Sequence, residues 1–291
     1  MVGEDFHAFK MRDAVTPKLR VPSQAYSFDE FNSRNKIDST SFISVGSLAT
    51  GGLSNSWGCG VAKYSAAEIK QFPFQHSDLE LSYANVSLRI GISGKTNDDM
   101  SEYFGLDDYA QPPIKMDLSH SYLSQNYLKH KKKLNTQGFK MGRPKLAALS
   151  EDFANRKACN LSSNCLWGCK RQSLYSSADE LPNLRIHVNF REHSGFIVEN
   201  LDKKEGYWQV EGRDITDNSY KTYTAKKVVM AAGTLATTRI VLQTLKFTNS
   251  VPLYSSPSAA FLLWLPRFLG LKRQSGFGLG QLSYALNIDD S

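Results

Sequence analysis

Residues 226–245 read KKVVMAAGTLATTRIVLQTL, and this stretch decides the fold class that the sequence predicts. The uninterrupted apolar run 228–232 is typical of a buried strand, and Gly233 ends it. Residues 235–245 then have the spacing of a helix that turns Ile240, Val241 and Leu245 inward. Strand, glycine and helix in this order form the crevice in which α/β sheets bind cofactors. The stretch therefore predicts an α/β fold with a Rossmann-like sheet.

The residues before this stretch alternate between apolar and polar side chains, as strands do. A short strand is expected over Leu184–Val188, and three further strands over Ser194–Leu201, Tyr207–Arg213 and Ser219–Thr224. Turn residues separate the last three, at 205–206 and 217–218. These segments predict an antiparallel β-meander, which makes the fold class mixed α/β and α+β.

Residues 51–60 read GGLSNSWGCG, a loop in which four glycines and three small polar residues surround one tryptophan. Glycines allow the backbone to approach a ligand closely, and Ser54, Asn55 and Ser56 add short donors beside the flat ring of Trp57. The pattern matches neither G-x-G-x-x-G nor a phosphate-binding P-loop. It predicts a contact with a phosphate or cofactor, and an ordinary turn between packed segments is the alternative.

The first half of the chain is expected to be helical and rich in loops. Residues 1–40 have little periodicity and are interpreted as an extended lead-in, followed by a short strand at Ser41–Gly46. Ser65 is a candidate N-cap. Helices are expected over 76–95, ending at Gly91, and around 119–133.

Three cysteines, Cys159, Cys165 and Cys169, form a C-x5-C-x3-C pattern. Three thiolates at this spacing can converge on a three-iron cluster. Zinc would need a fourth ligand, for which His187, His193 and Cys59 are candidates. The third possibility is a set of free, partly buried cysteines.

The composition of the 291 residues is that of a globular protein, with 41% hydrophobic and 22% charged residues. The net charge is +7, but the basic residues are scattered, and the dense run 129–133 is interpreted as a solvated helix face and not as a nucleic-acid site. No secretory signal opens the chain. The longest apolar run, 259–265, is far shorter than the ~20 residues that a bilayer span needs. We therefore expect a cytoplasmic protein without a membrane span and without a nucleic-acid partner.

Taken together and in this order, these segments resemble the glucose–methanol–choline (GMC) family of FAD-dependent oxidoreductases over most of residues 41–245. The resemblance implies that FAD is the cofactor and that the glycine loop lies along the flavin and pyrophosphate. It implies that the segment 196–198, represented by Ile197, holds the adenosine end, and that the next helix begins at the phosphates. Some members carry a three-iron 3Fe-4S cluster on a C-x5-C-x3-C segment, which Cys159, Cys165 and Cys169 match. The implied FAD-binding residues are Gly51, Gly52, Ser54, Asn55, Trp57, Gly58, Ile197, Ala232 and Gly233.

The sequence departs from the family pattern at both ends. The family opens with a strand and a G-x-G-x-x-G turn, and no such unit precedes residue 41. The family also ends with a catalytic histidine pair, whereas no histidine follows His193. The implied domains are the lead-in 1–40, a partial FAD-binding domain 41–245 with a helical insertion at 76–150, and the start of a substrate domain at 246–291. This chain alone is expected to bind FAD weakly or not at all and to be inactive.

The expected function is therefore oxidation of an alcohol or sugar hydroxyl by hydride transfer to FAD, by a truncated or split chain. Its partners would be that small substrate and an electron-acceptor protein or a complementary chain. Two alternatives remain: a non-catalytic remnant or binding module on the same scaffold, and a zinc-stabilised interaction protein.

Overall fold

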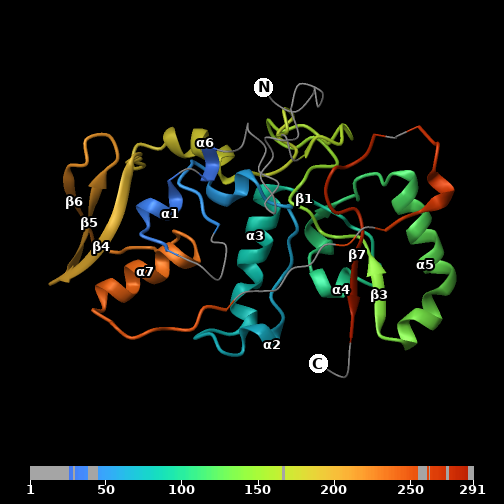
Figure 1. Cartoon of the computed structure of the whole chain (residues 1–291), viewed down its shortest axis with the longest axis horizontal. Coiled ribbons are helices and arrows are strands. Elements are labelled where there is room, and N and C mark those ends of the chain that lie inside the picture. Colours follow the sequence, from blue (N-terminus) through green and yellow to red (C-terminus); the bar gives the residue numbers. More distant parts are fainter. Residues whose placement is uncertain are drawn as a thin grey trace. The chain divides into compact units, whose positions relative to one another are not determined.

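The computed structural model describes residues 26–28, 30–38, 45–165, 168–254, 261, 263–272 and 275–287 (Figure 1). The chain forms two compact units. Unit 1 comprises Met1–Ser27, Ala49–Asp179 and Leu263–Ser291, and unit 2 comprises Phe28–Leu48 and Glu180–Leu262. The lead-in up to residue 25 and the strand residues 41–44 lie outside the described residues.

Unit 2 is built on the predicted β-meander. Strands β4 (Phe196–Lys204), β5 (Tyr207–Asp214) and β6 (Tyr220–Ala225) form an antiparallel sheet in the order β4-β5-β6. Helix α7 (Thr234–Thr244) contacts β4 and buries Ala236 and Ile240. The Arg239 guanidinium donates a hydrogen bond from Nη2 to the Val198 carbonyl at 3.2 Å, so the helix is tied to the backbone of β4.

Two predicted strands of unit 2 are absent, which corrects the expected sheet. Residues 181–185 form the short helix α6 (Leu181–Arg185), with Pro182 in its first turn, where proline is tolerated. Ile186 and Val188 are 78% and 89% exposed. The run 228–232 forms no strand either, and Val229 is 89% exposed. A strand needs a neighbour to take its backbone hydrogen bonds, and no strand in the described part of the chain lies beside this run.

The inward face of α7 also differs from the expectation. Ile240 is buried as predicted, but Val241 is 37% and Leu245 69% exposed. Ala236 and Ile240 are four residues apart and therefore lie on the same face of the helix. The sheet covers only this face. The coarse prediction of a mixture of helices and antiparallel sheet is confirmed.

Unit 1 contains helices α2 to α5 and two small sheets. Helix α2 (Ala66–Ile69) begins with a capping box: the amide of Glu68 donates to Ser65 Oγ at 3.2 Å, and the amide of Ser65 donates to the Glu68 carboxylate at 2.7 Å. The predicted helix over 76–95 is a 3-10 turn, η5 (His76–Leu79), followed by α3 (Glu80–Ile90), and Gly91 ends it with φ of 69°. The remaining elements are α1 (Phe31–Arg34, in unit 2), α4 (Ser101–Phe104), α5 (Leu118–Thr136), the parallel pair β1 (Ile92–Ser93) and β2 (Ala110–Gln111), and the antiparallel pair β3 (Phe139–Gly142) and β7 (Ser283–Leu286).

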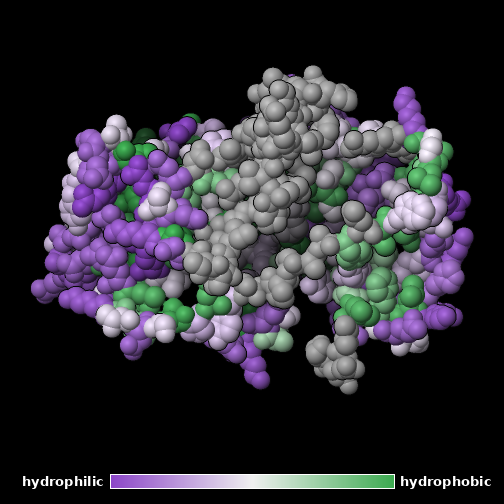
Figure 2. Space-filling view, in the orientation of Figure 1, coloured by the Kyte–Doolittle hydropathy of each residue, from purple (hydrophilic) through white to green (hydrophobic). Residues whose placement is uncertain are grey.

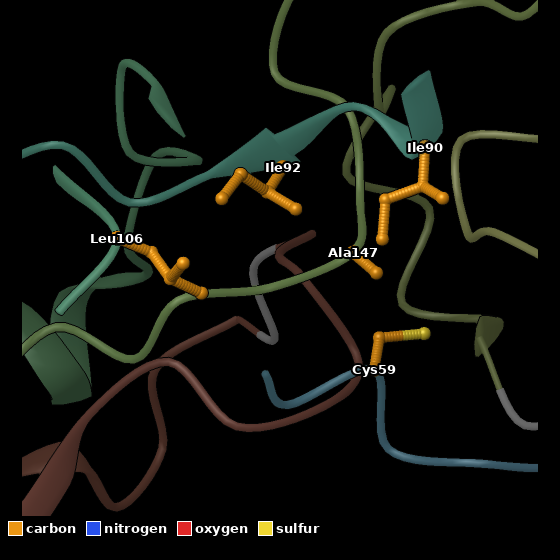
Figure 3. Packing of buried hydrophobic residues seen from close by; sticks show 5 residues of the cluster. All are labelled: Cys59, Ile90, Ile92, Leu106 and Ala147. Carbon is orange, nitrogen blue, oxygen red and sulfur yellow. The ribbon is translucent and has the colours of Figure 1, made fainter. Parts of the chain in front are cut away.

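The core of unit 1 surrounds the segment Leu146–Leu149, whose side chains are at most 4% exposed. Its backbone is hydrogen-bonded to three other parts of the unit. The amide of Ala147 donates to the Cys59 carbonyl at 2.7 Å, Ser93 and Leu146 exchange two hydrogen bonds, and the amide of Leu149 donates to the Ser173 carbonyl at 2.9 Å. Figure 3 shows Cys59, Ile90, Ile92, Leu106 and Ala147 converging in this core. The segment therefore connects the glycine loop to the region that carries the cysteines.

Candidate functional site: the glycine loop and the cysteine segment

The glycine loop of unit 1 is a tight turn. Its residues Gly52–Asn55 form a single 3-10 turn, η4, and Gly51 and Gly52 have φ of 91° and 56°. These angles lie in the left-handed region that glycine adopts without strain. Gly51 and Gly52 therefore form the tight turn that was the alternative interpretation of this loop, and the cofactor contact stays a prediction.

The polar side chains of the loop bind a second segment of the same unit, at residues 175–177. The amide of Ser177 donates to Ser54 Oγ at 2.9 Å, and Ser176 Oγ donates to Asn55 Oδ1 at 2.7 Å. The indole of Trp57 donates from Nε1 to the Tyr175 carbonyl at 2.9 Å. Three of the predicted ligand-binding side chains thus fix the loop against its neighbour.

The glycines at the far side of the loop face open space. A Cβ atom built on Gly52, Gly58 or Gly60 would meet no atom within 4 Å, whereas one on Gly51 would meet Asn55 Oδ1 at 2.7 Å. The backbone of the loop is therefore enclosed by side chains at Gly51 and accessible at Gly52, Gly58 and Gly60. A flat ligand could approach the accessible side to backbone contact.

The remaining predicted cofactor-binding residues belong to unit 2. Ile197 lies in β4 opposite Arg213 and is half-buried. Ala232 and Gly233 are exposed just before α7, and the amide of Ala232 donates to the Thr237 side chain at 3.1 Å. Gly233 has φ of 80° and, like Gly52, has open space beside its Cα.

The three cysteines of the motif are half-buried, and each sulfur has a polar neighbour. The Leu161 amide donates to Cys159 Sγ at 3.4 Å, and the Gly278 amide donates to Cys165 Sγ at 3.3 Å. Cys169 Sγ lies 3.1 Å from Ser173 Oγ. Backbone amides around sulfur are the kind of contact that tunes a metal–sulfur centre.

Cys59 belongs to the core cluster of Ile90, Ile92, Leu106 and Ala147, whereas Cys159 and Cys165 pack against a second cluster that contains Leu146 and Phe277. The side chain of Cys59 is fully buried, and burial raises the pKa of its thiol to about 12, with smaller contributions from the thiols of Cys165 and Cys169. The pKa of Cys165 is likewise raised by burial, to about 11. Burial also raises the pKa of Cys169, but hydrogen bonds outweigh burial there, that of Ser173 first among them, and the pKa of this thiol is lowered.

No three histidine, cysteine or acidic side chains are arranged to hold a single metal ion in the parts of the chain that the structure describes. A zinc ion would bring its sulfurs to within ~3.8 Å of one another, given Zn–S bonds of ~2.3 Å. The histidines considered as a fourth ligand, His187 and His193, belong to unit 2, and the cysteines belong to unit 1.

Arg156 organises the cysteine segment and was not recognised from the sequence. It is 6% exposed, and its guanidinium donates hydrogen bonds to the carbonyls of Ile90, Gln172 and Ser173. These bonds connect Arg156, just before the three cysteines, to residues 172–173, just after them, and to the C-terminus of α3 at Ile90. A lone arginine between loop residues carries no periodic signal, so only its contacts reveal this role.

No family model matches the chain, and no curated protein matches it. The resemblance to the GMC family therefore rests on the segments quoted above. Among the described residues, no helix is long and apolar enough to cross a membrane.

Proposed function

We propose that this chain contributes to a GMC-type flavoprotein that oxidises an alcohol or sugar hydroxyl. The observation that carries the proposal is the glycine loop, whose side chains bind residues 175–177 while Gly52, Gly58 and Gly60 have open space beside them. Such a surface lets a flat ring system lie against backbone. FAD, when bound, would supply the hydride-accepting chemistry.

The residues of the loop would have distinct tasks. Gly52 and Gly58 would allow the cofactor to approach, because a side chain at either position would fill the accessible side. Ser54, Asn55 and Trp57 would hold the loop in shape through their bonds to residues 175–177.

The cysteine segment would serve electron transfer. Cys159, Cys165 and Cys169 would hold a 3Fe-4S cluster, whose ligands stand farther apart than those of a single ion. The hydrogen bonds that the sulfurs of Cys159 and Cys165 accept from backbone amides would tune its potential. The electrons would pass to an acceptor protein.

A non-catalytic binding module is the second candidate, and one observation favours it. The side chains of Ser54, Asn55 and Trp57 already have partners within the chain, so the loop needs no ligand to satisfy them. The two candidates differ in whether the open side of the glycine loop binds flavin.

Titration of the purified chain with FAD distinguishes the flavoprotein from the non-catalytic module. We expect weak but saturable binding, followed by flavin fluorescence. Gly58→Val should abolish the binding without unfolding the chain, because the new side chain would enter open space. Gly280→Val is the matched control, since Gly280 has equally open surroundings in unit 1 outside the loop. Absence of saturable binding, or equal loss in both variants, would favour the non-catalytic module.

Metal analysis tests the cluster separately. Chain purified without oxygen should contain iron and acid-labile sulfide, and replacing Cys159, Cys165 and Cys169 by serine should remove both. The same substitution at Cys59 should leave a three-iron cluster in place. Protein without iron or sulfide would refute the cluster and leave the flavin proposal untouched.

A further inference from the structure

The loop that precedes β7 exposes large apolar side chains next to basic ones. Within Leu263–Lys272, the side chains of Leu263, Trp264, Leu269 and Leu271 are 66%, 76%, 67% and 59% exposed. Arg267 and Lys272 are exposed between and beside them. Figure 2 shows hydrophobic surface in the region where Figure 1 draws this loop beside α5. Four such side chains on ten residues form a cluster and not scattered single exposures.

Aromatic contacts hold the loop on α5. The Arg267 guanidinium lies 4.6 Å from the centre of the Tyr122 ring, and the Phe268 ring meets the same ring edge-on at 5.7 Å. Phe268 is half-buried by this contact. The loop is thus anchored through Arg267 and Phe268, while its four apolar side chains remain exposed to solvent.

The face of α5 that receives the loop is itself apolar and basic. Leu118, Tyr122, Lys129 and Lys133 follow one another at spacings of four, seven and four residues, which places them on one side of a helix. Leu118 is 50% exposed, and Lys129 and Lys133 are exposed with no ion pair to any described residue. Hydrogen bonds to Asn126 and Arg267 lower the pKa of Tyr122, and the Lys129 charge contributes, which is consistent with the loop and this side of the helix being adjacent.

The two segments that form this face carry no acidic residues. From Asn218 to Ile288 the sequence contains no aspartate or glutamate, and α5 contains none either. Asp117, at the start of α5, is partly buried and accepts hydrogen bonds from Ser119, His120 and Gln281. A second copy of the chain would present the same positive charge and be repelled, whereas an anionic surface would be attracted.

We propose that the apolar–basic face, formed by the exposed side chains of Leu263–Lys272 with Leu118, Lys129 and Lys133 of α5, binds the surface of an anionic lipid bilayer. Leucine and tryptophan side chains would enter the boundary between headgroups and acyl chains, where the amphipathic indole is favoured. The lysines and Arg267 would lie at the headgroups. The chain would then lie on the membrane without crossing it.

Vesicle sedimentation of the complete chain tests this. We expect binding to vesicles of equal parts phosphatidylcholine and phosphatidylglycerol, and little binding to pure phosphatidylcholine. Trp264→Ser with Leu269→Ser should weaken binding by roughly tenfold per side chain, the loss of apolar burial of one residue. Lys129→Gln with Lys133→Gln should weaken it about fivefold per charge, and added salt should do the same.

Two control variants test whether vesicle binding depends on this face in particular. Ile186→Ser with Val188→Ser removes equally exposed apolar side chains of unit 2 and should leave binding unchanged. Trp264→Phe should still bind, but the blue shift of tryptophan emission on adding vesicles should disappear. Failure to bind anionic vesicles, or equal losses in the unit 2 control, would refute the proposal. Self-association that the Trp264 and Leu269 variants abolish, with no lipid binding, would assign the face to a second copy and also refute it.

Discussion

Replacement of Arg156 by lysine should selectively destabilise the part of unit 1 that holds the cysteines. The guanidinium reaches three carbonyl oxygens at once, those of Ile90, Gln172 and Ser173, from a site that is 6% exposed. It also lies 5.4 Å from the centre of the Tyr175 ring. Lysine keeps the charge but not the planar fork of donors, so it can serve only one of these acceptors well.

The loss of stability follows from the number of carbonyl groups that would be left without a hydrogen bond. A hydrogen bond to a charged group contributes ~1.5–3 kcal/mol, and two of the three would be lost. Allowing for relaxation and for non-additive effects, we expect Arg156→Lys to cost about 3–5 kcal/mol of the free energy of unfolding. A domain of this kind has about 5–15 kcal/mol in total, so unit 1 would become marginal.

Amide hydrogen exchange followed by mass spectrometry measures the loss where it occurs. Peptides covering residues 86–95 and 144–150 should exchange faster, while peptides of β4 to β6 in unit 2 serve as internal reference. Arg171→Lys is the matched control, because Arg171 is exposed and, among the residues that the structure describes, donates to one carbonyl, that of Ala158. A loss in Arg156→Lys no larger than in the control would refute the view that Arg156 holds the segment together.

Three further predictions concern other buried contacts. Burial raises the pKa of Asp117, but hydrogen bonds from the first turn of α5 outweigh it and lower the pKa to about 2. The ionised carboxylate therefore stabilises the folded state fully above pH ~4, and this contribution is lost as the pH falls through ~2. Asp117→Asn should thus cost about 2 kcal/mol in urea unfolding at pH 7 and nothing at pH 2; an equal cost at both would contradict this. Gly212→Ala should weaken the β4–β5 pairing by about 2–3 kcal/mol, since its Cβ would lie 2.0 Å from the Ile197 carbonyl oxygen, and unchanged exchange of the β4 amides would speak against it. Asp107→Asn should cost about 3–5 kcal/mol of the free energy of unfolding, because the fully buried ammonium of Lys145, 3.1 Å from Asp107, would lose its counter-charge. Lys145→Met should cost less, and calorimetry giving the reverse order would disprove the assignment.

The sequence by itself determined the elements whose causes are local. Ser65 and Glu68 begin α2 as a capping box, and Gly91 ends α3, because these effects act within a few residues. The meander was also predictable, since alternation and turn residues encode antiparallel hairpins between consecutive segments. The glycine loop was identified as a special backbone, and Gly51 and Gly52 have the positive φ angles expected of it.

The tertiary structure alone decided the rest, because burial and pairing depend on residues far along the chain. The apolar run 228–232 predicts a strand, but Val229, Ala231 and Ala232 are exposed and no described strand lies beside the run to pair with it. Cys59 lies 100 residues before Cys159 in sequence, and only the tertiary structure shows that the backbone of each is hydrogen-bonded to the segment Leu146–Leu149. The same holds for Arg156, whose three acceptors come from two distant segments. Local patterns specify how a backbone turns, whereas long-range contacts specify which side chains meet.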